Sequence, residues 1–154
     1  VGAAETKKLN KDEKIIYSLH GDGELQEGQI WEAAIYASAK NIDNLICTID
    51  LNGQQIDGST DEVMNMGSLE TKFKAFGFDV LVEKDGNDMA KVLAALAEAK
   101  LRTGKGKPVC ILLHTEMGNG VDFMMGSHKW HGVAPNDQEL ANALSQNEET
   151  LGDY

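Results

Sequence analysis

The chain has 154 residues, of which 42% are hydrophobic and 6% aromatic, and its 14 Lys and Arg against 25 Asp and Glu give a formal net charge of −11. One domain of this length buries roughly two thirds of the surface its unfolded chain exposes, so a core can form without disulfides or a structural metal. The acidic balance argues against nucleic acid as a partner, and the absence of a long apolar run or a secretory leader makes a cytoplasmic protein without membrane segments the expectation.

The first half of the chain predicts a strand, a helix and a second strand. Residues 14–19 form a β-branched apolar run that ends in the tight turn Gly21-Asp22-Gly23. Apolar residues recur at helical spacing over 26–40, and a second strand is predicted over 44–51. The pair Asn52-Gly53 closes that strand with a turn that tolerates positive φ.

The second half repeats the alternation after a polar, irregular stretch that continues to residue 68. The predicted elements, in order, are a helix over 69–76, a strand over 79–83, a helix over 87–103 opening at an Asn cap, a strand over 108–114 and a helix over 136–147. The strands are apolar on both faces, which is typical of a parallel sheet with helices on both sides. We expect an α/β fold in which residues 1–154 form one domain.

Two polar residues follow neighbouring predicted strands. Asp22 closes the first strand and Asn52 the second, with one helix and one strand between them, so the two should lie side by side at the carboxyl edge of the sheet. A carboxylate repels a phosphate unless a divalent cation lies between them, and Mg²⁺ prefers carboxylate, amide and carbonyl oxygens. The pair therefore predicts a Mg²⁺-phosphate site, although each dipeptide taken alone is equally typical of an ordinary turn.

Three motifs in the same order carry a resemblance over nearly all of residues 12–146. GDG followed after 28 residues by Asn52 is similar to the thiamine diphosphate motif. GDGELQEGQIWEA, DNLICTIDLNGQQIDG and GSHKWHGVAPND together resemble the transketolase family, and most of all the N-terminal subunit of its split form. The resemblance implies a thiamine diphosphate-binding fold that is incomplete here, because the family's domain begins with a further segment upstream. The chain would then be the C-terminal part of that domain.

The resemblance also implies roles for individual residues. Asp22, Asn52 and the main-chain oxygen of Gln54 match the Mg²⁺ ligands. Matched cofactor-binding positions are Gly21, Asp22, Gly23, Glu24, Asn52, Ile56 and His131, of which Ile56 would pack against the thiazolium ring. His131, His128 and Glu27 match catalytic positions, and Glu27 and Glu32 match an acidic network at a dimer interface, although carboxylates at a helix start are also favoured by the helix dipole alone.

Two positions depart from the family pattern. His20 stands where the family usually has a small or apolar residue, beside the expected metal site. The loop Glu116–Gly120 keeps the family's glycines without its basic residues, so contacts that depend on those charges are not expected here.

The activity implied by the resemblance is transfer of a two-carbon ketol unit between sugar phosphates with thiamine diphosphate and Mg²⁺. The glutamate that engages the cofactor's pyrimidine lies in the family on another domain or subunit, so a homodimer or heterotetramer is expected and the chain by itself should be inactive. The alternatives are a 1-deoxyxylulose-phosphate synthase, an oxo-acid dehydrogenase component, or a non-catalytic fragment that binds no cofactor alone.

Overall fold

Four parallel strands form the central sheet of the computed structural model, which describes residues 1–147. Their spatial order is β1 (Ile16–Gly21), β2 (Leu45–Leu51), β6 (Val109–His114) and β5 (Asp79–Glu83). The register places Gly21 beside Asp50 and Leu51 beside His114. The carboxyl ends of the first three strands therefore meet at one edge of the sheet, as the alternating sequence pattern predicts.

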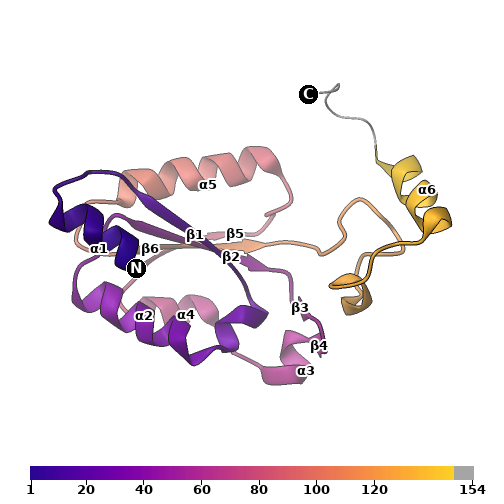
Figure 1. Cartoon of the computed structure of the whole chain (residues 1–154), viewed down its shortest axis with the longest axis horizontal. Helices are drawn as coiled ribbons and strands as arrows, with labels where there is room; N and C mark the ends of the chain where they lie inside the picture. The colour runs from indigo at the N-terminus through magenta and orange to yellow at the C-terminus, as the bar shows by residue number, and fades with distance from the viewer. Residues whose placement is uncertain (148–154) are drawn as a thin grey trace.

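Helices cover both faces of this sheet, which confirms the predicted α/β fold (Figure 1). One face carries α2 (Gly28–Ala39) and α4 (Leu69–Ala75), with α1 (Gly2–Leu9) on the same side, and α5 (Met89–Arg102) covers the other. Trp31 of α2 lies against two phenylalanine rings, with centroid distances of 5.3 Å to Phe73 and 5.0 Å to Phe76. Its indole N–H donates to the main-chain oxygen of Leu25 at 2.8 Å, so this tryptophan belongs to the core.

The structure corrects three details of the predicted elements. Gly23–Gln26 form a 3₁₀ turn, and α2 begins only at Gly28, so no α-helix starts directly after Asp22. Helix α5 is capped by Asp88, whose carboxylate accepts from the N–H of Ala90, because Asn87 turns away toward the 116 loop. Strand β1 is an edge strand, and it buries one face only.

The stretch after β2 is more ordered than its polar composition indicates. It contains the short antiparallel strands β3 (Gln54–Gln55) and β4 (Gly58–Ser59) and the helix α3 (Thr60–Met64). Gly53 adopts the predicted positive φ, 73°. This hairpin folds over the end of β2, and it places the residues after Asn52 close to the turn that follows β1.

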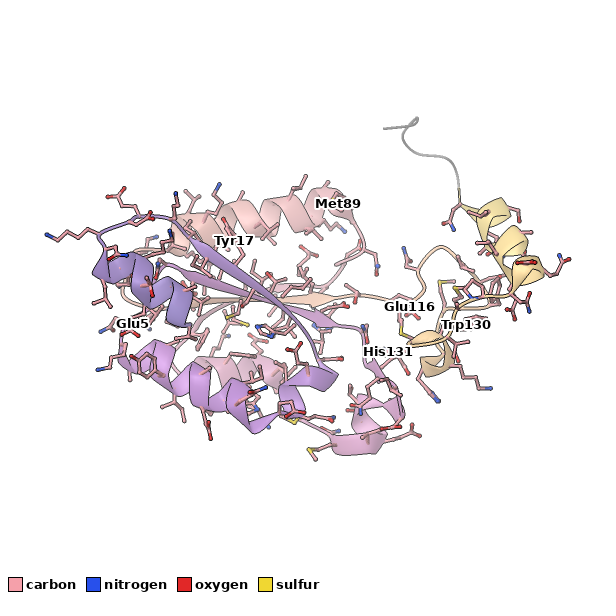
Figure 2. The ribbon with its side chains drawn as sticks, in the orientation of Figure 1. Glu5, Tyr17, Met89, Glu116, Trp130 and His131 are labelled. Atoms are coloured by element: carbon pink, nitrogen blue, oxygen red, sulfur yellow. The ribbon has the colours of Figure 1, made fainter. Side chains whose placement is uncertain are left out.

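Residues 115–147 extend beyond the carboxyl ends of the strands (Figure 1). They include a 3₁₀ turn at His128–Trp130 and helix α6 (Asp137–Gln146), which opens with a capping box between Asn136 and Glu139. Trp130 packs edge-on against Phe123 at 5.3 Å and donates to its main-chain oxygen. The segment is thereby folded back so that His131 lies between it and the strand ends (Figure 2).

No helix within residues 1–147 has the length and apolar character needed to cross a bilayer.

Candidate functional site

A cavity of about 500 Å³ opens at the carboxyl ends of β1 and β2. Its walls come from the turn after β1, the end of β2, the β3–β4 hairpin and the C-terminal segment. The lining residues are Gly21, Asp22, Gly23, Glu24, Asp50, Asn52, Gln54, Gln55, Ile56, Asp57 and His131.

Asp22 is the one fully buried charged or polar side chain among residues 1–147, with 3% of its surface exposed. One carboxylate oxygen accepts from the N–H of Gly23 at 2.8 Å and the other from the N–H of Gly53 at 2.6 Å. Desolvation raises the pKa of this carboxyl and the neighbouring Asp50 charge raises it further, although both backbone hydrogen bonds oppose the shift. Asp22 thus joins the ends of β1 and β2 and favours a cation beside it.

Asn52 is held in one orientation by two neighbours. Its Nδ2 donates to Asp50 Oδ2 at 3.1 Å, and its Oδ1 accepts from the N–H of Gln54 at 2.9 Å. A carboxylate can only accept and a backbone N–H can only donate, so the two bonds together determine which end of the amide is the oxygen. An amide oxygen has two lone pairs, which leaves one for a further partner.

The glycines of the first turn differ in what surrounds them. A Cβ on Gly23 would come within 3.0 Å of the Gln55 Cβ, whereas a Cβ on Gly21 would meet nothing within 4 Å. Gly23 is therefore required by the hairpin that packs on it, in addition to any close approach of a ligand. The N–H of Gly21 donates to Glu24 at 3.3 Å, which ties the turn together.

The structure brings most of the predicted binding residues into this one cavity and leaves three predicted residues outside it. Glu27 and Glu32 are exposed at the start of α2, away from the lining residues, and His128 lies in the 3₁₀ turn without reaching the cavity. His20 also lies outside: its ring faces Glu24 at 3.2 Å and an apolar cavity beneath the sheet. It therefore does not crowd the strand ends.

Sequence reasoning missed Asp50, Gln55 and Asp57, which line the same cavity. Asp50 could have been found, because residues two apart on a strand share a face and Asp50 precedes Asn52 by two. Gln55 carries a buried side-chain oxygen without a hydrogen-bond partner among the described residues. Such an orphaned acceptor is uncommon in a folded protein and is satisfied when a ligand or water fills the cavity.

A second cavity of about 470 Å³ adjoins the first across Asp50 and Asn52. Its other walls are Asn87, Thr115 and residues 116–119 of the glycine loop. The main-chain N–H of Glu116 donates to Asn87 at 2.7 Å, and the Glu116 carboxylate accepts from the N–H of Gly126 at 2.7 Å. These bonds place the glycine loop beside the end of β2.

The first cavity is strongly acidic. Four carboxylates line it, those of Asp22, Glu24, Asp50 and Asp57, and within the described part of the chain no lysine or arginine does. No cluster of three His, Cys, Asp or Glu side chains suited to a metal occurs in residues 1–147, so a transition-metal site is not indicated. A buried carboxylate beside an oriented amide oxygen is the chemistry of a Mg²⁺ site that is completed by ligand oxygens, and the residues present fit that ion.

Comparison with known proteins agrees with this arrangement. The model of the family "Transketolase, thiamine diphosphate binding domain" matches residues 3–149. Two relatives are one chain of an apulose-4-phosphate transketolase from Phocaeicola vulgatus, named as a subunit and 38% identical over 151 residues, and the 6-deoxy-6-sulfo-D-fructose transketolase subunit SqwG from a Clostridium species, 37% identical over 146. The matches cover 98% and 95% of this chain but 53% and 52% of those proteins. The chain thus spans about half the length of these relatives.

Solved structures share the fold. A transketolase from Pichia stipitis in complex with sedoheptulose-7-phosphate matches with a TM-score of 0.82 and 28% identity, and a transketolase from Campylobacter jejuni with 0.81 and 32%. Each match covers 94% of this chain and 22% of the other.

Proposed function

Since the chain belongs to the transketolase family through its thiamine diphosphate-binding domain, we propose that it supplies the diphosphate and Mg²⁺ site of an enzyme that transfers a two-carbon ketol unit between anionic sugars. In this proposal residues 1–154 are one domain, the C-terminal part of the cofactor-binding unit.

The charge of the cavity is the observation that carries the proposal. A diphosphate brings several negative charges, and the four carboxylates that line the cavity would repel it. A divalent cation between the two reverses that repulsion, and the buried Asp22 carboxylate is the group that gains most from it. The cavity therefore suits a diphosphate that arrives with Mg²⁺ and does not suit a diphosphate alone.

Asp22, the free lone pair of Asn52 and the main-chain oxygen of Gln54 would hold the ion. Gly21, Gly23 and Glu24 form the turn beneath the diphosphate, and Ile56 is the apolar wall of the same cavity. Thiamine diphosphate, when bound, supplies the carbon that attacks a ketose carbonyl and the electron sink that follows. The chain's own part is to fix the position of the reacting group, which lowers the entropic part of the barrier.

His131 is the residue of this chain that we assign to proton transfer. Its imidazole lines the cavity opposite the turn after β1, and an imidazole can both accept and donate a proton near neutral pH. We propose that it hydrogen-bonds diphosphate or substrate oxygens and moves a proton at a substrate hydroxyl. His128 lies three residues away, outside the lining, and its assignment as a helper stays a prediction.

The remaining parts of the active site are proposed to come from elsewhere. No lysine or arginine among the described residues lines the cavity, so the anionic end of the sugar would be bound by another domain or another chain, as would the cofactor's pyrimidine. The names of two relatives call them subunits of transketolases, which supports a partner chain in a homodimer or heterotetramer. Glu27 and Glu32 are exposed and available to such an interface. The same names specify apulose-4-phosphate and 6-deoxy-6-sulfo-D-fructose, so the sugar need not be a common pentose phosphate.

Titration of the intact protein with thiamine diphosphate, with and without Mg²⁺, tests the proposal. We expect calorimetric binding that requires the ion in the parent protein and is lost in Asp22→Ala, because the variant removes the buried bridging charge. Asp57→Ala removes a carboxylate from the same cavity that makes no hydrogen bond to either strand end, and it should still bind. Cofactor binding unaffected by Asp22→Ala, or no binding by the parent protein, would contradict the proposal.

A further inference from the structure

Asp50 makes contacts that no role has yet explained. One of its carboxylate oxygens accepts from Asn52 Nδ2 at 3.1 Å and the other from the hydroxyl of Thr115, and its main-chain oxygen accepts from the N–H of Asp22 at 3.1 Å. Asp50 therefore contacts both proposed side-chain ligands of the cation while lying at the boundary between the two cavities.

The hydrogen bond to Asn52 decides which atom of that amide faces the cation. Rotating the amide by half a turn would set its oxygen against the Asp50 carboxylate and its NH₂ against the N–H of Gln54, two repulsive contacts. In the observed orientation both neighbours are satisfied and the oxygen keeps a lone pair. Without Asp50, only the Gln54 N–H would favour this orientation.

Thr115 in turn holds Asp50. It follows β6, its N–H donates to the main-chain oxygen of Leu51 at 3.3 Å, and its hydroxyl donates to the Asp50 carboxylate from 65 residues away. The hydroxyl occupies the oxygen of Asp50 that does not contact Asn52, so the carboxylate cannot swing away without losing that bond. Asn52, Asp50 and Thr115 form a chain of hydrogen bonds that crosses from β2 to β6.

We propose that Asp50, held by Thr115, is the positioning residue that presents the Asn52 oxygen to the cation and so sets the site's affinity for Mg²⁺ and its preference over Ca²⁺. This inference rests on the proposed function. Mg²⁺ requires near-ideal octahedral geometry with ligands at fixed places, whereas Ca²⁺ tolerates irregular and mobile ligands. Loss of the Asp50 contact should therefore weaken Mg²⁺ more than Ca²⁺.

Five variants of the intact protein separate positioning from simple charge. Asp50→Leu removes both the charge and the acceptor at similar side-chain shape, and Asp50→Asn removes the charge but keeps an oxygen that can accept from Asn52. Thr115→Val removes the hydroxyl, and Thr115→Ser keeps it. Asp57→Asn removes a charge from the same cavity without a contact to Asn52. Mg²⁺ and Ca²⁺ are titrated calorimetrically into each protein in the presence of saturating thiamine diphosphate, and metal-free unfolding in urea is measured alongside.

We expect Mg²⁺ affinity to fall roughly 10- to 100-fold in Asp50→Leu, the range typical of residues that orient a metal ligand. The loss should be clearly smaller in Asp50→Asn, intermediate in Thr115→Val and restored in Thr115→Ser, and Ca²⁺ affinity should fall less than Mg²⁺ affinity in every weakened variant. Asp57→Asn should resemble the parent protein.

Equal losses in Asp50→Asn, Asp50→Leu and Asp57→Asn would show a pure charge effect and overturn the inference, as would an unchanged ratio of Mg²⁺ to Ca²⁺ affinity. A loss of Mg²⁺ affinity that only follows a lower free energy of unfolding across the variants would also overturn it. If the parent protein binds no Mg²⁺, the proposed function fails first, and that result is distinct from any of these.

Discussion

A single carboxylate, that of Asp22, connects the two strand ends on which the proposed site depends. It accepts from backbone N–H groups after β1 and after β2, and burial raises its pKa. Its charge is thus tolerated but not neutralised by the protein. At the residue scale the site is organised by hydrogen bonds between neighbours, and a cation is what completes them.

Gly23 and Gly21 provide a matched pair for testing how the first turn is packed. Gly23→Ala sets a Cβ 3.0 Å from the Gln55 Cβ, so the hairpin must move, and we expect the free energy of unfolding to fall by about 1–3 kcal/mol. Gly21→Ala meets nothing within 4 Å and should change it by less than about 0.5 kcal/mol. Urea unfolding of the metal-free proteins measures both, and equal values for the two would argue against the packing role of Gly23.

His131→Ala should affect turnover more than cofactor binding. If the imidazole moves a proton, kcat falls by roughly 10²- to 10⁴-fold, while the Kd for thiamine diphosphate changes only a few-fold because Asp22 and Asn52 still hold the ion. His128→Ala should lose less activity, because His128 does not line the cavity. Steady-state kinetics and calorimetry on the assembled enzyme measure the two quantities. Full activity in His131→Ala would remove this residue from the mechanism.

At the scale of elements, the edge of the sheet opposite the site is held by Asp43, in the turn between α2 and β2. Its carboxylate meets Lys8 of α1 at 2.5 Å and accepts from the N–H of Gly106 at 2.9 Å, and its main-chain oxygen accepts from the N–H of Gly104. One residue thus joins α1, the start of β2 and the turn after α5. This arrangement leaves the carboxyl edge free for binding.

The pKa of Asp43 predicts how stability depends on pH. Burial acts to raise this pKa, but the Lys8 ammonium and the Gly106 N–H outweigh it, and the pKa lies below the ordinary 3.8. The unfolded chain therefore binds the proton more tightly than the native protein, so the stabilisation is complete above about pH 4 and is lost as pH falls through the lowered native value.

Asp43→Ala should cost about 1–3 kcal/mol of unfolding free energy at pH 7 and flatten the fall in stability below pH 4. The matched control is Asp85→Ala, which breaks an exposed pair with Lys91 and should cost clearly less, because water and salt screen exposed ion pairs. Urea unfolding between pH 3 and pH 7 distinguishes them. An Asp43→Ala variant whose pH profile parallels that of the parent would contradict this role.

On the scale of the whole molecule, the proposed ligands join segments that are otherwise separate. The turn after β1, the β3–β4 hairpin and the segment that carries His131 all line one cavity, but they come from distant parts of the chain. The C-terminal segment extends past the strand ends and meets the sheet mainly there (Figure 1). Binding should therefore reduce motion at this edge and leave the remote faces unchanged.

Hydrogen exchange tests this expectation. Mg²⁺ with thiamine diphosphate should slow amide exchange in residues 21–26, 52–58 and 127–131, and helix α5, which packs away from the cavity, should exchange at the same rate with and without ligand. Mass spectrometry of the assembled protein reports each peptide. Uniform slowing along the chain, or protection confined to α5, would place the ligand elsewhere.

Much of the fold could be predicted because its signals are local. The β-branched runs and helical periodicities located four strands and four helices, and the alternation of the two indicated a parallel sheet. The errors also have local causes. The two-sided burial expected of β1 is wrong because Tyr17 and Leu19 are 50% and 72% exposed, and apolar composition cannot say which strand lies at an edge. Asn87 and Asp88 are both good caps, and the contact with Glu116 selected between them.

The sequence by itself determined the elements, the family and the adjacency of Asp22 and Asn52, because each follows from residue patterns within about thirty positions. Only the tertiary structure decided the strand order, the acidic cavity without a basic residue among residues 1–147, and the hydrogen-bonded chain from Asn52 through Asp50 to Thr115. These depend on contacts between distant segments: β6 lies beside β2 although β5 and α5 intervene in the chain. Neither periodicity nor spacing contains such a contact, because it is set by how whole elements pack together.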